Sequence, residues 1–226
     1  MNIYIYIYIY IYIYIFMSKC SHIDISGEIK NFDITTPRSL FVKWKAEAEG
    51  IKSDDDVFLA VLSTVGATGI IDSCTIRIIS FDPIFKNTGK FIFFSPHLSG
   101  KCINILHNPN VSLLFRWKER QLIIKAKGIL QTPSENKIFW DLKSEKNKIH
   151  AWESYHNKHI DKNDFLIDGR IIIPIVPFWG SVRLEPFEFD FSEEINSFRT
   201  RQRGHYFLNK DGSFELSPKM KIYSFI

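Results

Sequence analysis

Arg77, Ser99 and Lys101 have the side chains that proteins use to bind an anion. A guanidinium and an ammonium supply positive charge, and a hydroxyl donates or accepts a hydrogen bond. Ser99 and Lys101 stand near the start of a short predicted helix, where backbone N–H groups and the helix dipole favour negative charge. Taken singly, Arg77 also fits a solvated or ion-paired strand residue, and Ser99 and Lys101 fit an ordinary helix start. An anion site and a plain surface both stay open.

Residues for several other kinds of chemistry are absent or scattered. Cys20, Cys74 and Cys102 are far apart and form no CxxC pair, which argues against a disulfide scaffold or a cysteine zinc site. Reduced thiols fit a cytoplasmic protein. No GxGxxG or P-loop lysine motif occurs. The net charge is only +4 and the basic run FRTRQRGH (198–205) is short, so we expect no nucleic-acid partner.

Six consecutive Ile-Tyr pairs follow Met1 and Asn2, and we expect them to be an appendage. Ile3 to Phe16 is 14 residues, shorter than the ~20 that a membrane-spanning helix needs, and six of the 14 are Tyr. It also lacks the basic start and the cleavage site of a signal peptide, so we expect no membrane partner. An ATATAT repeat read in frame gives Ile-Tyr codons. We therefore expect a translated simple repeat, with Met17 as the natural start.

Hydrophobic periodicity predicts the elements that must position the candidate residues. We expect helices over 37–50, 97–109 and 134–154, a turn or helix cap at 53–57, a loop at 82–89, strands over 57–66, 72–81, 90–95 and 169–191, and hairpins formed by 111–117 with 120–131 and by the two halves of 205–218. Leu40, Phe41, Trp44 and Ala48 share one helix face. Trp152 and Trp179 are predicted to be core residues. Many short strands with few helices predict a mainly β fold, an antiparallel barrel.

Eight short strings occur in an order that indicates a known family. They are TIRIISF (75–81), FIFFSPHLSGK (91–101), NPNVSLLFRW (108–117), ERQL (119–122), IHAWES (149–154), PFWGSVRLEP (177–186), FRTR (198–201) and ELSP (215–218). In this order they resemble the pyridoxamine 5'-phosphate oxidase family, from about Pro37 to Pro218. Each string alone is weak, but eight in sequence make chance a poor explanation.

The resemblance implies an FMN-binding split β-barrel that works as a homodimer. It implies residues 1–36 as a repeat and lead-in, 37–185 as the barrel, and 186–226 as a C-terminal dimerisation region. It also implies an oxidase that converts pyridoxamine or pyridoxine 5'-phosphate to pyridoxal 5'-phosphate with O2, and therefore a small phosphorylated substrate. Two alternatives stay open. One is an FMN oxidoreductase of the same fold with another substrate, and the other is a non-catalytic flavin- or pyridoxal-phosphate-binding protein.

The resemblance assigns cofactor contacts to positions that match the family's motifs. The resemblance assigns the FMN phosphate to Arg77, Ser99 and Lys101. It assigns the flavin ring to a glutamine, an arginine and the residues around them. The full set is Arg77, Ile78, Ile79, Phe94, Ser95, Ser99, Lys101, Gln121, His156, Asn157 and Arg201. Two departures weaken it. Gly100 stands where the family has an arginine, and Ser192 stands where it has a tryptophan.

The substrate side departs further from the family. A family lysine falls on Asp82, and the next arginine becomes Lys143. The tyrosine that binds substrate phosphate falls on Phe139, or on Trp140 if the alignment gap shifts by one residue. The family's Arg-Leu-His string reads Ser197-Phe198-Arg199. The resemblance makes Phe139, Lys143, Ser197 and Arg199 the substrate-binding set, with Arg199 as the one catalytic candidate. Nothing in the sequence replaces the lost imidazole.

Overall fold

Alternation of buried and exposed residues builds the strands around one core. The computed structural model describes residues 37–50, 58–81, 90–194, 200–217 and 223–224. In β5 (Asn110–Trp117) every second residue from Val111 to Trp117 is buried, and β6 (Arg120–Leu130) buries Leu122, Ile124 and Ala126 in the same way. A period of two places these side chains on one face of the sheet and mostly polar residues, with Leu114 and Ile123, on the other.

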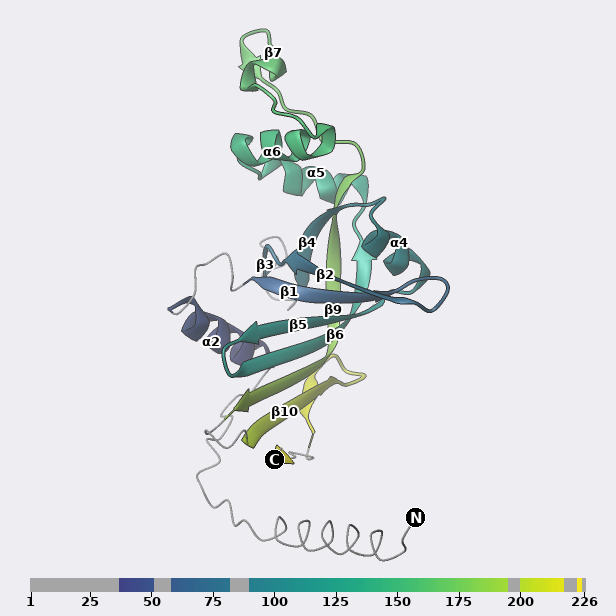
Figure 1. Cartoon of the computed structure of the whole chain (residues 1–226), viewed down its shortest axis with the longest axis vertical. Helices are drawn as coiled ribbons and strands as arrows, with labels where there is room; N and C mark the ends of the chain where they lie inside the picture. The colour runs from purple at the N-terminus through teal and green to yellow at the C-terminus, as the bar shows by residue number, and fades with distance from the viewer. Residues whose placement is uncertain (1–36, 51–57, 82–89, 195–199, 218–222, 225–226) are drawn as a thin grey trace, which may run out of the picture. The chain divides into compact units, whose positions relative to one another are not determined.

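The strands form one antiparallel, ten-stranded sheet (Figure 1). Its main order is β11-β10-β9-β6-β5-β1-β2, with β4 paired to β9, β3 to β4 and β12 to β10. The remaining bounds are β1 (Leu59–Val65), β2 (Ile71–Arg77), β3 (Ser80–Phe81), β4 (Phe91–Pro96), β9 (Trp179–Glu194), β10 (Thr200–Leu208), β11 (Phe214–Leu216) and β12 (Tyr223–Ser224). β7 (Leu166–Ile167) and β8 (Arg170–Ile171) make a separate small pair.

The long strand β9 divides the sheet into two halves. β6 runs along one edge of β9 for nearly its whole length. The other edge is shared, because β4 pairs with residues 179–184 and β10 pairs with residues 188–194. Pro186 lies at the change of partner, opposite a register shift at Lys125/Ala126 in β6. Proline donates no backbone hydrogen bond, so the two partner strands separate at this point.

The first half closes into a barrel through the segment after β2. The Ile78 N–H donates to the Phe58 carbonyl at 2.9 Å, and the Ile79 N–H donates to the Ile92 carbonyl of β4 at 2.9 Å. The chain then enters β3, which pairs with β4. The edge strand β2 is therefore connected to β4 through residues 78–81, and this connection closes the barrel on that side.

Four helices flank the strands in the described chain: α2 (Pro37–Glu49), α4 (Gly100–His107), α5 (Pro133–Asp141) and α6 (Glu145–His156), with a 3-10 turn η1 (Lys162–Phe165). α2 packs on the barrel, since the Phe41 ring lies 5.2 Å from Phe91 and 5.6 Å from Phe115, and Trp44 lies 5.1 Å from Phe191. Leu40, Phe41, Trp44 and Ala48 are all buried, as their spacing predicted.

Most predicted elements are confirmed, including the mainly β class, the 111–131 hairpin and the turn at Asp211-Gly212. Two predictions are wrong in extent. The helix expected over 134–154 is two helices, because Ser144 caps a new one by accepting from the Asn147 N–H. The strand expected over 169–191 is interrupted at 172–178, around Pro174 and Pro177. The segments 53–57 and 82–89 lie outside the described residues.

Trp152 and Trp179 are also not core residues, as both are only half-buried. The Trp152 indole N–H donates to the Pro174 carbonyl at 2.8 Å from a helix, α6, that buries none of its residues. The predicted division at 185/186 stays a prediction, and β9 continues across it. In the described parts of the chain, no helix is both long and apolar enough to cross a membrane.

Candidate functional site

Ser95, Ser99 and Lys101 form one polar cluster where β4 ends and α4 begins, here called the hydroxyl–lysine cluster. The two hydroxyl oxygens lie 2.9 Å apart, and Lys101 Nζ donates to Ser95 Oγ at 3.2 Å. Ser99 is the N-cap residue of α4, but its side chain makes no capping hydrogen bond. A Cβ built at Gly100 meets no atom within 4 Å, so the first residue of α4 is open on that side. Ser99 and Lys101 are partly exposed at this helix N-terminus, whereas Ser95, to which both bond, is buried.

Two contacts fix α4 on the barrel. The buried Asn104 side chain donates to Thr64 Oγ1 at 3.1 Å and to Asp72 Oδ2 at 2.9 Å, and these two residues are cross-strand partners on β1 and β2. On β6, a Cβ at Gly128 would lie 3.0 Å from Ile105 of α4. The helix therefore lies against bare backbone at this point. Sequence reasoning missed Asn104 and Gly128, because neither carries a recognisable motif.

Arg77 ends β2, three residues before the chain pairs with β4. Ser80 pairs with Ile92 across β3 and β4, and the Ile79 amide also bonds to Ile92. Arg77 itself pairs with Leu59 of β1, and the Ile78 amide bonds back to Phe58, so the pairing with β4 starts only after Arg77. Arg77 is exposed on the face away from the core. Ile78 and Ile79 were also predicted to contact the cofactor. Their backbone N–H groups already donate to Phe58 and Ile92 and close the barrel, so these two donors are not available to a ligand.

One row across the sheet leads from Arg77 to Gln121. Arg77 pairs with Leu59, and Gln121 pairs with Arg116. The β1–β5 register, in which Val61 faces Leu114, extends to place Leu59 beside Arg116. Cross-strand partners share a face, and three strand spacings of about 4.8 Å give about 14 Å between the ends of the row. An elongated ligand with a phosphate at one end and a polar ring at the other fits this separation.

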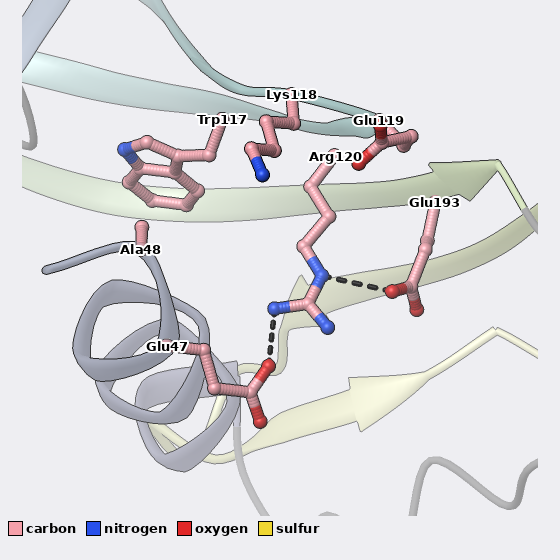
Figure 2. A pocket seen from close by; sticks show the side chains of 7 residues that line it. All are labelled: Glu47, Ala48, Trp117, Lys118, Glu119, Arg120 and Glu193. Atoms are coloured by element: carbon pink, nitrogen blue, oxygen red, sulfur yellow. Dashed lines mark hydrogen bonds and ion pairs between the residues drawn. The ribbon is translucent and has the colours of Figure 1, made fainter. Parts of the chain in front are cut away.

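Arg120, the neighbour of Gln121, is held between two carboxylates (Figure 2). It donates from Nε to Glu193 Oε1 of β9 at 2.8 Å and from Nη1 to Glu47 Oε2 of α2. Its guanidinium also lies 5.1 Å from the Trp44 ring. Burial alone would lower the pKa of Arg120, but the hydrogen bonds and charges of Glu47 and Glu193 outweigh it and raise the pKa above its ordinary value. The start of β6 is therefore tied to both α2 and β9.

Phe94, Phe139, Trp179 and Lys143 form a second group, the aromatic–lysine cluster. The Phe94 ring lies 4.8 Å from Trp179 and 5.8 Å from Phe139. Lys143 Nζ lies over two of these rings, 4.3 Å from the centroid of Phe94 and 5.4 Å from the centroid of Trp179. Burial lowers the pKa of Lys143. Phe94 and Ser95 are successive residues of β4, so the two clusters share this strand while the two side chains point to opposite faces of it.

Other predicted site residues are not gathered with these. His156 and Asn157 end α6 and are exposed, and His156 stacks on Trp152 at 5.4 Å. No interaction found among the described residues joins them to either cluster. Arg201 is described only as a backbone position in β10, paired with Glu194. Ser197, Arg199 and Asp82 lie outside the described residues. The described chain also contains no group of His, Cys, Asp and Glu that is arranged to hold a metal ion.

Curated proteins with similar sequences carry one name. No protein-family model matches the chain. It is 27% identical over 167 residues to pyridoxine/pyridoxamine 5'-phosphate oxidase of Bartonella henselae, covering 69% of this chain and 77% of the relative. The enzyme of that name from Rhodopseudomonas palustris is 26% identical over 202 residues, which cover 83% of this chain and 91% of the relative. The chain is a divergent relative of these oxidases.

Two solved structures have the same fold as this chain. PhzG from Burkholderia lata 383, in complex with tetrahydrophenazine-1-carboxylic acid, superposes with a TM-score of 0.65 at 21% identity, covering 84% of this chain and 95% of PhzG. A pyridoxamine 5'-phosphate oxidase-related, FMN-binding protein from Nostoc punctiforme gives 0.63 at 15% identity, with 81% and 97% covered. The barrel with one long shared strand is therefore the split β-barrel of this family.

Proposed function

We propose that this chain binds FMN and oxidises pyridoxamine or pyridoxine 5'-phosphate to pyridoxal 5'-phosphate. The observation that carries the cofactor half is the hydroxyl–lysine cluster, with Ser99 and Lys101 at an open helix start and Ser95 bonded to both. A phosphate binds well where hydroxyls, an ammonium and helix N–H groups converge. The sequence relatives named as oxidases of this kind support the reaction.

The donor set fits the two ends of FMN. Ser95, Ser99, Lys101 and Arg77 would hold the phosphate, and Gln121 at the other end of the row would bond to the polar edge of the ring. When bound, FMN supplies the hydride acceptor, which O2 reoxidises with release of hydrogen peroxide. The protein's own part is to hold the substrate carbon against the ring and to exclude water.

The remaining predicted residues belong to a homodimer in this proposal. His156 and Asn157 are exposed at the end of α6, and α6 buries none of its residues although it carries Trp152 and Tyr155. A second copy would cover this helix and contribute these residues, with Arg201, to the ring end of the site. Ser197 and Arg199 would bind the substrate, with Arg199 holding its anionic group.

Titration of the purified chain with FMN tests the cofactor half. We expect flavin fluorescence to be quenched on binding, and Lys101→Ala to weaken the affinity by about tenfold or more because a charge-assisted hydrogen bond is lost. Lys127→Ala, on an exposed position of β6, is the control. Formation of pyridoxal 5'-phosphate tests the substrate half. Quenching without turnover would reject this substrate and keep the cofactor, whereas no quenching would favour a protein that does not use flavin.

A second candidate is an FMN oxidoreductase of the same fold with another substrate. It is favoured by Phe139, which has no hydroxyl for a phosphate, and by Lys143, which lies over aromatic rings. PhzG, which has the same fold, is in complex with a ring carboxylic acid, tetrahydrophenazine-1-carboxylic acid. Bleaching of the bound flavin by a panel of reduced compounds under nitrogen separates the two candidates.

A further inference from the structure

The aromatic–lysine cluster differs in chemistry from the hydroxyl–lysine cluster on the same strand. The hydroxyl–lysine cluster contains two hydroxyls, an ammonium and a helix start. The aromatic–lysine cluster contains three rings and one ammonium, and its Phe139 is 6% exposed and has no hydroxyl. The chain therefore has one group of side chains that suits a phosphate and a second group that lacks hydroxyl donors.

Lys143 offers a single positive charge there. Among the described residues, its ammonium has no hydrogen-bond or ion-pair partner, and it lies 4.3 Å from the Phe94 ring and 5.4 Å from the Trp179 ring. Ring faces attract a cation but leave N–H donors for an anion. The half-buried ammonium is partly desolvated, as its lowered pKa indicates, so an anion bound beside it would regain part of the lost stabilisation.

The rings supply the second half of the recognition. The ring planes of Phe94 and Trp179 are tilted by 37° to each other, and Trp140 packs edge-to-face on Trp179 with 5.0 Å between the ring centroids. The Trp140 indole N–H donates to the Ile173 carbonyl at 3.0 Å. Trp179 follows Phe178, which has φ 59°, a backbone conformation that bulky residues rarely adopt. The turn that sets Trp179 is therefore held in place by its surroundings. Fixed aromatic walls suit a planar apolar ring.

We propose that the aromatic–lysine cluster binds a planar ring compound through a single carboxylate, in preference to a phosphate ester. Lys143 pairs with the carboxylate, and Phe94, Phe139 and Trp179 contact the ring. This inference deepens the second candidate function and rests on that site being the substrate site. A phosphate dianion at the same place would have only one cation and none of the hydroxyls that the hydroxyl–lysine cluster uses.

Matched ligands test the preference directly. Naphthalene-2-carboxylate and 2-naphthyl phosphate share a ring and differ in the anion, and isothermal titration calorimetry measures both on the full chain with and without FMN. We expect the carboxylate to bind about tenfold more tightly than the phosphate. Lys143→Met should weaken the carboxylate by about tenfold, whereas Lys137→Met, on the exposed side of α5 and paired with Asp141, should not. The double variant Phe139→Tyr/Lys143→Arg should reverse the preference.

The outcomes separate this inference from the cofactor proposal. Tighter phosphate binding in the unaltered chain, no carboxylate binding at millimolar concentration, or unchanged carboxylate binding in Lys143→Met would each overturn it. FMN quenching is read independently, so a chain that binds FMN and prefers the phosphate refutes only the present inference. A chain that prefers the carboxylate but quenches no flavin refutes only the cofactor proposal. Far-UV circular dichroism of each variant confirms that the fold is intact.

Discussion

Replacing Arg120 by Met should destabilise the fold and loosen the cofactor end of the row. Met keeps an apolar stem of similar length and removes the guanidinium, so the two carboxylates lose their partner. Arg120 is 24% exposed, Glu193 31% and Glu47 42%, which places the group between a buried and a surface ion pair. After discounting for solvent, each contact is worth about 1 kcal/mol, and the Trp44 contact adds about 0.5 kcal/mol. The expected loss is about 2–3 kcal/mol.

Urea and thermal denaturation measure this loss. For a chain of this size it corresponds to a fall in Tm of about 5–10 °C. Glu47→Gln alone should cost about 1 kcal/mol or less, because it leaves the Glu193 contact in place. The double variant Arg120→Met/Glu47→Gln should cost less than the sum of the single changes, since the two residues share one interaction. Lys127→Met, exposed on the same strand, serves as the control and should change stability by less than about 0.5 kcal/mol.

The functional readout is FMN affinity at a temperature where every variant is folded. If Arg120 positions Gln121, Arg120→Met should weaken quenching while Glu47→Gln leaves it nearly unchanged. Rescue by Arg120→Lys should be partial, because an ammonium cannot bond in two directions as the guanidinium does. A stability within 0.5 kcal/mol of the unaltered chain, or strict additivity with Glu47→Gln, would show that this ionic group does not hold α2, β6 and β9 together.

Two further changes probe the support of the site and its response to acid. Gly128→Ala places a Cβ against Ile105 of α4, so we expect a loss of about 1–3 kcal/mol and weaker FMN binding, measured by denaturation and quenching; unchanged values in both would refute the close approach. For Glu188, burial raises the pKa but the hydrogen bonds from Lys125 and His205 outweigh it, and the pKa lies below its ordinary value of 4.5. Glu188 therefore stabilises the fold above pH 4.5 and this contribution is lost as the pH falls through the lowered pKa. The stability gap between the unaltered chain and Glu188→Gln should narrow in acid, and a gap that widens there would contradict this sign.

The elements that sequence predicted well are those set by local pattern. Leu40, Phe41, Trp44 and Ala48 follow helical spacing, and all four are buried. The 111–131 hairpin needed only two alternating runs and a short turn. The pairing of β4 and β10 along one edge of β9 depends on contacts between distant segments, and no local pattern encodes it. The break between α5 and α6 was missed because one capping serine overrode an amphipathic pattern that continues across it.

The site divides in the same way. Ser95, Ser99 and Lys101 were predicted from the family resemblance, since Ser99 and Lys101 alone also fit an ordinary helix start, and the structure joins all three by hydrogen bonds. Arg77 and Gln121 lie at opposite ends of one row of residues that crosses four strands. The strand register that creates this row cannot be read from the sequence alone. Lys143 was predicted to keep the charge of a family arginine. Its position over Phe94 and Trp179 was not predictable, because Trp179 was taken for a core residue.

The contrast between the two clusters has a physical cause in how each is supported. The hydroxyl–lysine cluster belongs to α4, which Asn104 bonds to two strands and Gly128 admits within contact of a third. A change there disturbs the closed barrel. Lys143 lies in the short break between α5 and α6, and α6 buries nothing of its own. We therefore expect substitution at that break to cost the barrel little, so the proposed substrate end can change its chemistry more readily than the proposed cofactor end.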